Sequence, residues 1–172
     1  MKKILATLAA VLCCATMFTS CNKDNHDSED EILNFAPLIQ WGCNISDVEQ
    51  HMQSKEWWAN GNDKLEYWEA PYKSWHKWYF VDNADLKLTE QYLFETKDGQ
   101  NLRYAISLCW NKDVPVQKFK NTLIHQGFHS TGYMVEFADD IYEVLLSSDG
   151  KTEALYLNDV ECYVAIYRPV EK

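Results

Sequence analysis

The chain has 172 residues, of which 47% are hydrophobic, and its formal net charge is −10. The apolar content is enough for a packed core, and the length fits one domain once short terminal segments are set aside. The acidic balance argues against nucleic acid as a partner, because phosphate backbones are bound by clustered lysine and arginine.

The first twenty residues have the pattern of an export signal. Lys2 and Lys3 form a positively charged start, and residues 4–17 (ILATLAAVLCCATM) form an apolar run. This run is shorter than the roughly 20 residues that a membrane-spanning helix needs, and small residues follow it. We therefore expect residues 1–20 to be a cleaved signal peptide.

Cys21 closes the sequence Phe18-Thr19-Ser20-Cys21, which resembles the lipobox of bacterial lipoproteins. The resemblance implies cleavage before Cys21 and attachment of acyl chains to it, so lipidation at Cys21 is predicted. Several chains make a stable membrane anchor without a transmembrane helix, since each buried methylene contributes about 0.8 kcal/mol. The alternative is an ordinary signal peptide in which the cysteine is incidental.

The segment after Cys21 is strongly acidic. Residues 22–31 (NKDNHDSEDE) hold five acids and one lysine. A segment with this charge cannot bury enough apolar surface to fold, so residues 21–31 are predicted to be a lipidated cysteine followed by a disordered tether. Acids at this place also resemble the surface-export signal of Bacteroides-type lipoproteins. We predict an outer-membrane protein, lipid-anchored at the cell surface, with the periplasmic face of that membrane as the alternative.

The remaining residues, 32–172, are predicted to form a single α+β domain. A first helix is expected to open within residues 45–49, with Ser46 as its cap, because Ser46 and Glu49 have the spacing of a capping box. A second helix is expected from about Pro115, because proline is tolerated in the first turn, and Gly127 is expected to end it.

Alternation of apolar and polar residues predicts antiparallel strands around two Asp-Gly turns. Residues 91–96 and 102–108 flank the first turn, and residues 141–147 and 152–157 flank the second. Asp-Gly supplies the positive φ that a tight hairpin needs. Two further strands are predicted at 133–137 and 163–167.

The order helix, strands, Asp-Gly hairpin occurs twice. It predicts two helix-plus-antiparallel-meander repeats, at about 41–110 and 111–172, with the helices packed on one face of antiparallel sheet. The element order resembles the tandem repeats of β-lactamase inhibitor protein and of small outer-membrane-assembly lipoproteins. That resemblance implies a periplasm-facing assembly or scaffold role as an alternative function, although a fold alone is no evidence of function.

Residues 55–80 (KEWWANGNDKLEYWEAPYKSWHKWYF) contain five tryptophans. Aromatic rings give large, rigid contact areas and dominate binding interfaces. Trp57, Trp58, Tyr72 and Trp75 lie beside Asn-Gly and Ala-Pro turn signals, where loops carry function. These four residues are predicted to bind a glycan or protein ligand.

Three other aromatic residues of this stretch are predicted to belong to the core. Trp78 and Phe80 share one strand face and are expected to lie under a helix, and Trp68 is expected to be buried with them.

Catalysis is not predicted, and a hydrolase is the least favoured alternative. Cys43 precedes a helix N-terminus, where the dipole would lower its pKa, with His51 or His76 as a possible base. Burial of Cys43 is the favoured explanation. Glu66 and Glu69 could act as a carboxylate pair on a glycoside, but acids are too common in this sequence to distinguish them.

No metal and no cofactor is predicted. His125 and His129 are four residues apart, but Gly127 interrupts the helix between them. Residues 139–140 with Glu136 could offer oxygen ligands to calcium, although a solvated hairpin turn is the more common explanation.

Three cysteines remain after the predicted cleavage and lipidation, namely Cys43, Cys109 and Cys162. They are predicted to be buried apolar residues. The alternative is one disulfide, which an exported protein would permit.

Overall fold

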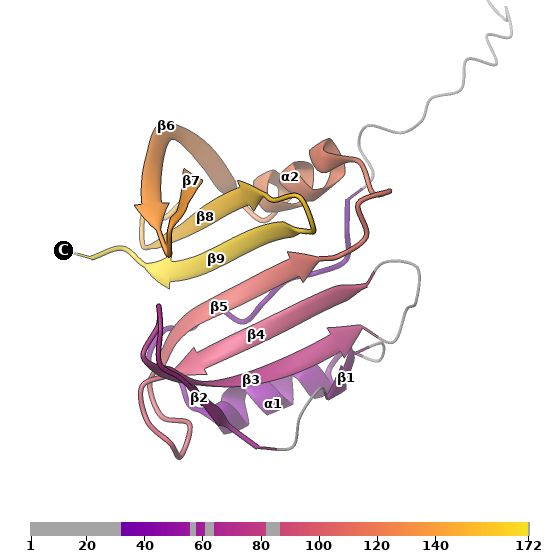
Figure 1. The fold of residues 1–172 in the computed structure, drawn as a ribbon. Helices are drawn as coiled ribbons and strands as arrows, with labels where there is room; N and C mark the ends of the chain where they lie inside the picture. The colour runs from indigo at the N-terminus through magenta and orange to yellow at the C-terminus, as the bar shows by residue number, and fades with distance from the viewer. Residues whose placement is uncertain (1–31, 56–57, 61–63, 82–86, 172) are drawn as a thin grey trace, which may run out of the picture.

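The computed structural model describes residues 32–55, 58–60, 64–81 and 87–171, so the predicted signal peptide, Cys21 and the tether lie outside the described part. Nine described strands form one antiparallel sheet, and two short helices pack against it (Figure 1). The sheet order is β1-β3-β4-β5-β9-β8-β7-β6, and β2 also pairs with β3. The strands are β1 (Trp58–Asn60), β2 (Glu66–Trp68), β3 (Ser74–Val81), β4 (Leu88–Phe94), β5 (Leu102–Cys109), β6 (Phe128–Phe137), β7 (Asp140–Ser147), β8 (Thr152–Asn158) and β9 (Tyr163–Pro169).

The prediction of two helix-plus-meander repeats is wrong. β5 pairs directly with β9, from Ala105 with Tyr167 to Cys109 with Tyr163, so the strands form one continuous sheet. The two predicted repeats also differ in strand pairing. In the first, β1 and β2 both pair with β3, whereas in the second β6 to β9 form a plain meander. The helices are only 9 and 10 residues long, so the fold is mainly one large sheet.

The predicted hairpins are confirmed. The first Asp-Gly turn joins β4 to β5, and the second joins β7 to β8. Gly99 and Gly150 have φ angles of +75° and +68°, in the left-handed region that glycine adopts without strain.

The first helix is capped two residues earlier than predicted, by Asn44 instead of Ser46. α1 (Ile45–Gln53) is capped by Asn44, whose Oδ1 accepts hydrogen bonds from the backbone N–H of Ser46 and Asp47 at 2.8 and 3.2 Å. The carboxylate of Asp47 accepts from the N–H of Asn44 at 2.9 Å, which completes a capping box. α2 (Val116–His125) begins directly after the predicted proline and has no side-chain cap.

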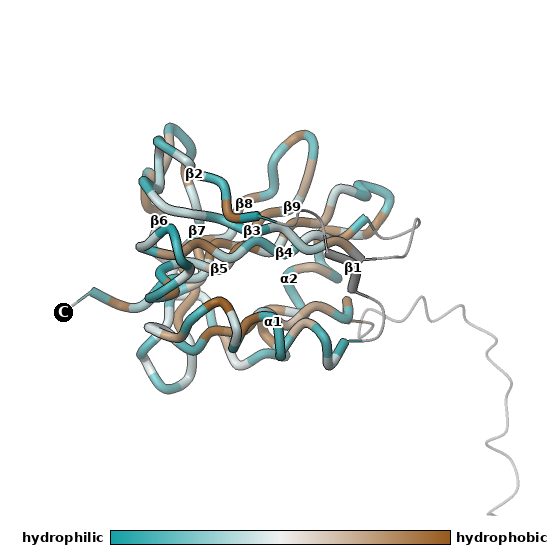
Figure 2. The backbone as a smooth tube through the Cα atoms, turned by 90° about the horizontal axis from the view of Figure 1, so that it is seen from below, coloured by the Kyte–Doolittle hydropathy of each residue, from teal (hydrophilic) through white to brown (hydrophobic). Residues whose placement is uncertain are grey.

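Both helices pack on the same face of the sheet. Val48 and Met52 of α1 and Phe119 and Leu123 of α2 belong to one buried cluster with the helix-facing strand residues. Figure 2 shows the two helices below β3 and β4. Among the described residues, neither helix is long and apolar enough to cross a bilayer.

An extended segment, residues 33–40, runs along the two helices, and we call it the strap. Its side chains Leu33 and Phe35 are buried in the same cluster as the helices. The N–H of Leu33 donates to Thr122 Oγ1 of α2 at 2.8 Å, and the N–H of Leu38 donates to Tyr92 Oη of β4 at 3.0 Å. The strap therefore closes the helix-facing core although it belongs to neither helix nor strand.

The opposite face of the sheet, which we call the helix-free face, carries a second buried cluster. Trp78 and Phe80 lie on this face, so the prediction that they pack under a helix is wrong. Trp68 and Trp78 pack against the second cluster and are half-buried, while Phe80 is 43% exposed. Alternation along β3 is the reason, because Tyr79 faces the helices and its two neighbours must face away.

The two turn glycines give a matched test of packing. A Cβ at Gly99 would lie 2.7 Å from Ile45 Cβ, whereas a Cβ at Gly150 would meet nothing within 4 Å. We expect Gly150→Ala to lower the free energy of unfolding by about 1–2 kcal/mol through backbone strain, and Gly99→Ala to lower it by about 2–4 kcal/mol because overpacking is added. Urea denaturation measures both, and equal losses would contradict a tight contact between Gly99 and Ile45.

Candidate functional site

Six rings form a continuous line across the helix-free face. The distances between neighbouring ring centroids are 5.5, 4.9, 5.3, 6.0 and 6.4 Å. Aromatic pairs prefer such separations in tilted or edge-to-face geometry. We call this line the aromatic row, and its members in spatial order are Phe137, Tyr72, Trp68, His76, Trp78 and Phe80.

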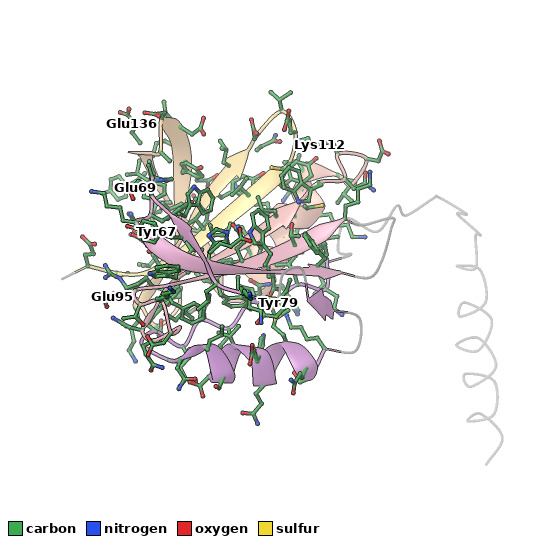
Figure 3. All side chains as sticks on the ribbon, turned by 60° about the horizontal axis from the view of Figure 1, so that its bottom comes forward. Tyr67, Glu69, Tyr79, Glu95, Lys112 and Glu136 are labelled. Carbon is green, nitrogen blue, oxygen red and sulfur yellow. The ribbon has the colours of Figure 1, made fainter. Side chains whose placement is uncertain are left out.

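Several elements position these rings. Alternation on β3 places its three members on one face, and β2 pairs with β3 so that Trp68 lies opposite Ser74. Tyr72 comes from the connection after β2, and its ring is 5.2 Å from that of Tyr104 on β5. Phe137 ends β6. Glu69 and Glu136, the sequence neighbours of Trp68 and Phe137, lie away from α1 in Figure 3, whereas Tyr79 lies on the side of β3 that faces α1.

The row rests on a buried floor and stays accessible from outside. The floor residues Leu93, Ile106 and Ile166 are almost fully buried. The tryptophans, Tyr72 and Phe137 are half-buried, so part of each ring remains open to solvent. A buried floor restricts ring movement, which lowers the entropic cost of binding a ligand.

The polar groups within the row are mostly uncharged. Burial lowers the pKa of His76, and Glu66, with Oε2 4.0 Å from His76 Nε2, offsets this only in part. His76 is therefore neutral at pH 7. Burial also raises the pKa of Tyr72, which stays a phenol. Nδ1 of His76 and Nε2 of Gln91, a residue only 1% exposed, find no hydrogen-bond partner within the described ranges.

The four predicted binding residues do not gather in one place. Trp57 lies outside the described residues, as does the side chain of Trp58. Tyr72 is part of the aromatic row. Trp75 pairs with Phe94 on the helix-facing side, where its ring lies 5.2 Å from that of Tyr67. A role of any of them in binding stays a prediction.

Five of the six members of the row, all except Tyr72, are absent from the predicted binding set, because nearness to turns selects other residues. His76, Trp78 and Phe80 have a period of two, which alone indicates one shared strand face. Phe137 comes from a distant hairpin, and its contact with Tyr72 depends on the way β6 and β7 curve over the sheet.

Cys43 lacks the properties of a nucleophile. It is 7% exposed, and burial raises the pKa of its thiol, contrary to the lowering considered for a helix N-terminus. His51 Nε2 instead lies 3.0 Å from the carbonyl oxygen of Ala36. His76 is on the other face of the sheet. The described cysteines Cys43, Cys109 and Cys162 are all free and buried.

The weaker site candidates remain separate on the surface. His125 and His129 are both exposed, as are Asp139 and Asp140 at the end of the β6–β7 hairpin. Within the part of the chain that the structure describes, no three histidine, cysteine or acidic side chains come together as metal ligands. Glu66 and Glu69 are exposed beside the aromatic row.

Comparison with known proteins gives no further assignment. Neither protein-family models, nor curated proteins, nor solved structures match this chain.

Proposed function

We propose that this protein is a non-catalytic binding module, lipid-anchored in the outer membrane, which holds a glycan at the cell surface on the aromatic row. The observation that carries the proposal is the continuous line of six rings over a buried floor, in which every ring except buried His76 is partly exposed. An elongated row of flat rings suits an elongated ligand, since successive sugar rings can stack on successive side chains. Exposed Glu66, Glu69 and Lys73 beside the row can hydrogen-bond hydroxyl groups.

Three alanine variants test this site, two of them on the aromatic row and one on the helix-facing side of the sheet. The lipidated protein in detergent is run by affinity electrophoresis through gels containing xylan, β-glucan, mannan or starch. We expect at least one polysaccharide to retard it, and Phe80→Ala or Trp68→Ala to weaken retardation about tenfold or more, as loss of a hot-spot ring does. Tyr67→Ala is the matched control, because Tyr67 is exposed beside Trp68 but faces the helix-facing side.

Two results would contradict the glycan proposal. The first is retardation that is equal in Phe80→Ala, Trp68→Ala and wild type. The second is the absence of retardation by any polysaccharide, together with capture of a protein ligand that Phe80→Ala abolishes, which would move the assignment to a protein partner.

Protease treatment of intact cells tests the location. With Cys21 lipidated and the tether leading outward, the wild-type domain is expected to be cleaved on whole cells, while Cys21→Ala is lost from the surface. The alternative, a periplasm-facing assembly or scaffold role, predicts protection until the outer membrane is broken. That alternative was based on a tandem-repeat resemblance, which the continuous sheet does not support.

A further inference from the structure

A hollow of about 410 Å³ lies at one end of the helix-facing side, where three segments converge. The strap and the turn after it contribute Ile39 and Trp41, the end of α2 contributes Gln126, and the β7–β8 turn contributes Ser148, Asp149 and Lys151. Its size falls within the range of small-molecule sites, roughly 300–1,000 Å³. We call it the Trp41 hollow, and it shares no lining residue with the aromatic row.

One wall of the hollow is apolar. Trp41 Nε1 donates to Thr152 Oγ1 at 3.0 Å, and Thr152 is buried. Because the single polar group of the indole is used, Trp41 offers only apolar ring surface to the hollow. Ile39 extends this wall, and a smaller hollow of about 230 Å³ adjoins it through Ile39 and Gln126.

The lining that comes from the β7–β8 turn carries a charged acceptor, Asp149, and a charged donor, Lys151. Asp149 Oδ1 accepts hydrogen bonds from Ser147 Oγ at 2.7 Å and from the N–H of Lys151 at 3.0 Å. Both hydrogen bonds lower the pKa of Asp149, and the bond from Ser147 has the larger effect. The carboxylate is therefore ionised at neutral pH. Asp149 Oδ2 lies 3.9 Å from Lys151 Nζ, and the two side chains are 59% and 80% exposed.

The pairing of these charges restricts the class of ligand. An anion would meet Asp149, and a cation would meet Lys151. A wholly apolar ligand would cover both charged groups without replacing their hydrogen bonds to water, which costs free energy. A neutral ligand with one apolar face and several hydroxyl groups satisfies both walls.

We propose that the Trp41 hollow is a second ligand site, which binds a saccharide ring. The apolar face of the ring lies on Trp41 and Ile39, and its hydroxyl groups donate to Asp149 and accept from Lys151. The site goes beyond the proposed function of the aromatic row, because different residues form it and a separate measurement reports on it.

Fluorine NMR tests the site directly. The lipidated protein in detergent is labelled with 5-fluorotryptophan, and the resonance of Trp41 is assigned as the one missing from Trp41→Phe. The probes are methyl glucoside, methyl galactoside, methyl mannoside and N-acetylglucosamine. At least one is expected to shift the Trp41 resonance saturably, with affinity falling about tenfold or more in Asp149→Asn and in Lys151→Ala, as loss of a charge-assisted hydrogen bond implies.

The other Asp-Gly turn provides a matched control. Asp98 accepts a hydrogen bond from Thr96 Oγ1, as Asp149 does from Ser147 Oγ, but it lies in the β4–β5 turn. Asp98→Asn therefore makes the same chemical change away from the hollow, and it is expected to leave saccharide affinity unchanged.

Three outcomes would overturn the inference. One is no saturable shift of the Trp41 resonance with any of the four saccharides. Another is equal affinity in Asp149→Asn and Asp98→Asn. The third is a larger saturable shift with tetramethylammonium or acetate than with the saccharides, which would assign a charged ligand to the hollow.

Discussion

Replacing Lys55 by methionine is expected to lower the free energy of unfolding by about 3–5 kcal/mol, because it leaves a buried carboxylate without its counter-charge. Glu90 on β4 has a side chain that is 0% exposed, and its Oε1 lies 3.2 Å from Lys55 Nζ. Tyr92 Oη donates to the other carboxylate oxygen at 2.7 Å, but a neutral hydroxyl cannot replace the ammonium group. Urea denaturation at pH 7 measures the loss.

A double-mutant cycle separates this effect from lost packing. Lys55→Met combined with Glu90→Gln is expected to be more stable than Lys55→Met alone, because no charge is then buried without a partner. A double variant less stable than Lys55→Met, or a loss below about 1 kcal/mol in Lys55→Met itself, would contradict a strong buried ion pair.

A second ion pair serves as the comparison. Lys120 Nζ lies 2.7 Å from Glu143 Oε2, but both side chains are more exposed to solvent. Lys120→Met is therefore expected to cost about 1 kcal/mol or less. Burial raises the pKa of Glu143, but hydrogen bonds from Lys120 and Ser130 outweigh it and the net pKa is lowered. The contribution of the ionised Glu143 carboxylate to folding stability is therefore present at neutral pH, and it is lost as the pH falls through the folded-state pKa of Glu143.

Phe35→Ala is expected to lower the free energy of unfolding by about 3–5 kcal/mol, the usual cost of emptying a buried phenylalanine site. The ring of Phe35 is buried, and its centroid lies 4.9 Å from that of Phe119. Its backbone carbonyl oxygen, which accepts a hydrogen bond from Gln126 Nε2, is kept in the variant, so the loss reports on the packing of the ring. Thermal and urea unfolding measure the change.

The neighbouring residue of the strap is the control for this variant. Asn34 is exposed, and Asn34→Ala is expected to change stability by no more than about 0.5 kcal/mol. If Phe35→Ala lowered the free energy of unfolding by as little as Asn34→Ala, the strap would be a peripheral segment rather than part of the core.

Local sequence signals predicted the hairpins but not which residue caps α1. Asn44 and Ser46 are both good capping residues, and the residue three positions after each is acidic. Tertiary contacts favour Asn44, because the N–H of Ile45 donates to the carbonyl of Gly99 at 2.8 Å. That bond fixes the chain at the helix entry and depends on a turn more than fifty residues away.

The two faces of the sheet show a second property that the sequence pattern does not predict. Alternation indicates that Trp78 and Tyr79 face opposite sides, but it does not indicate which side the helices cover. The packing of α1 decides this, and Lys77 Nζ lies 2.9 Å from Glu49 Oε1 of α1. The pairing of β5 with β9 is equally non-local, and local order alone therefore resembled two separate repeats.

The strap also determines how the domain would bear a load. Residues 22–31, fully extended, span at most about 36 Å, and any pull on a lipidated Cys21 would reach the domain at Leu33. The strap is held by the side chains of Thr122, Lys55 and Tyr92 and by its own buried side chains Leu33 and Phe35, rather than by a strand ladder. Tension would therefore be shared between both helices and β4, and no edge strand would be unzipped. The aromatic row lies on the helix-free face, so the surface proposed to bind the ligand would stay intact until the strap detached from the core.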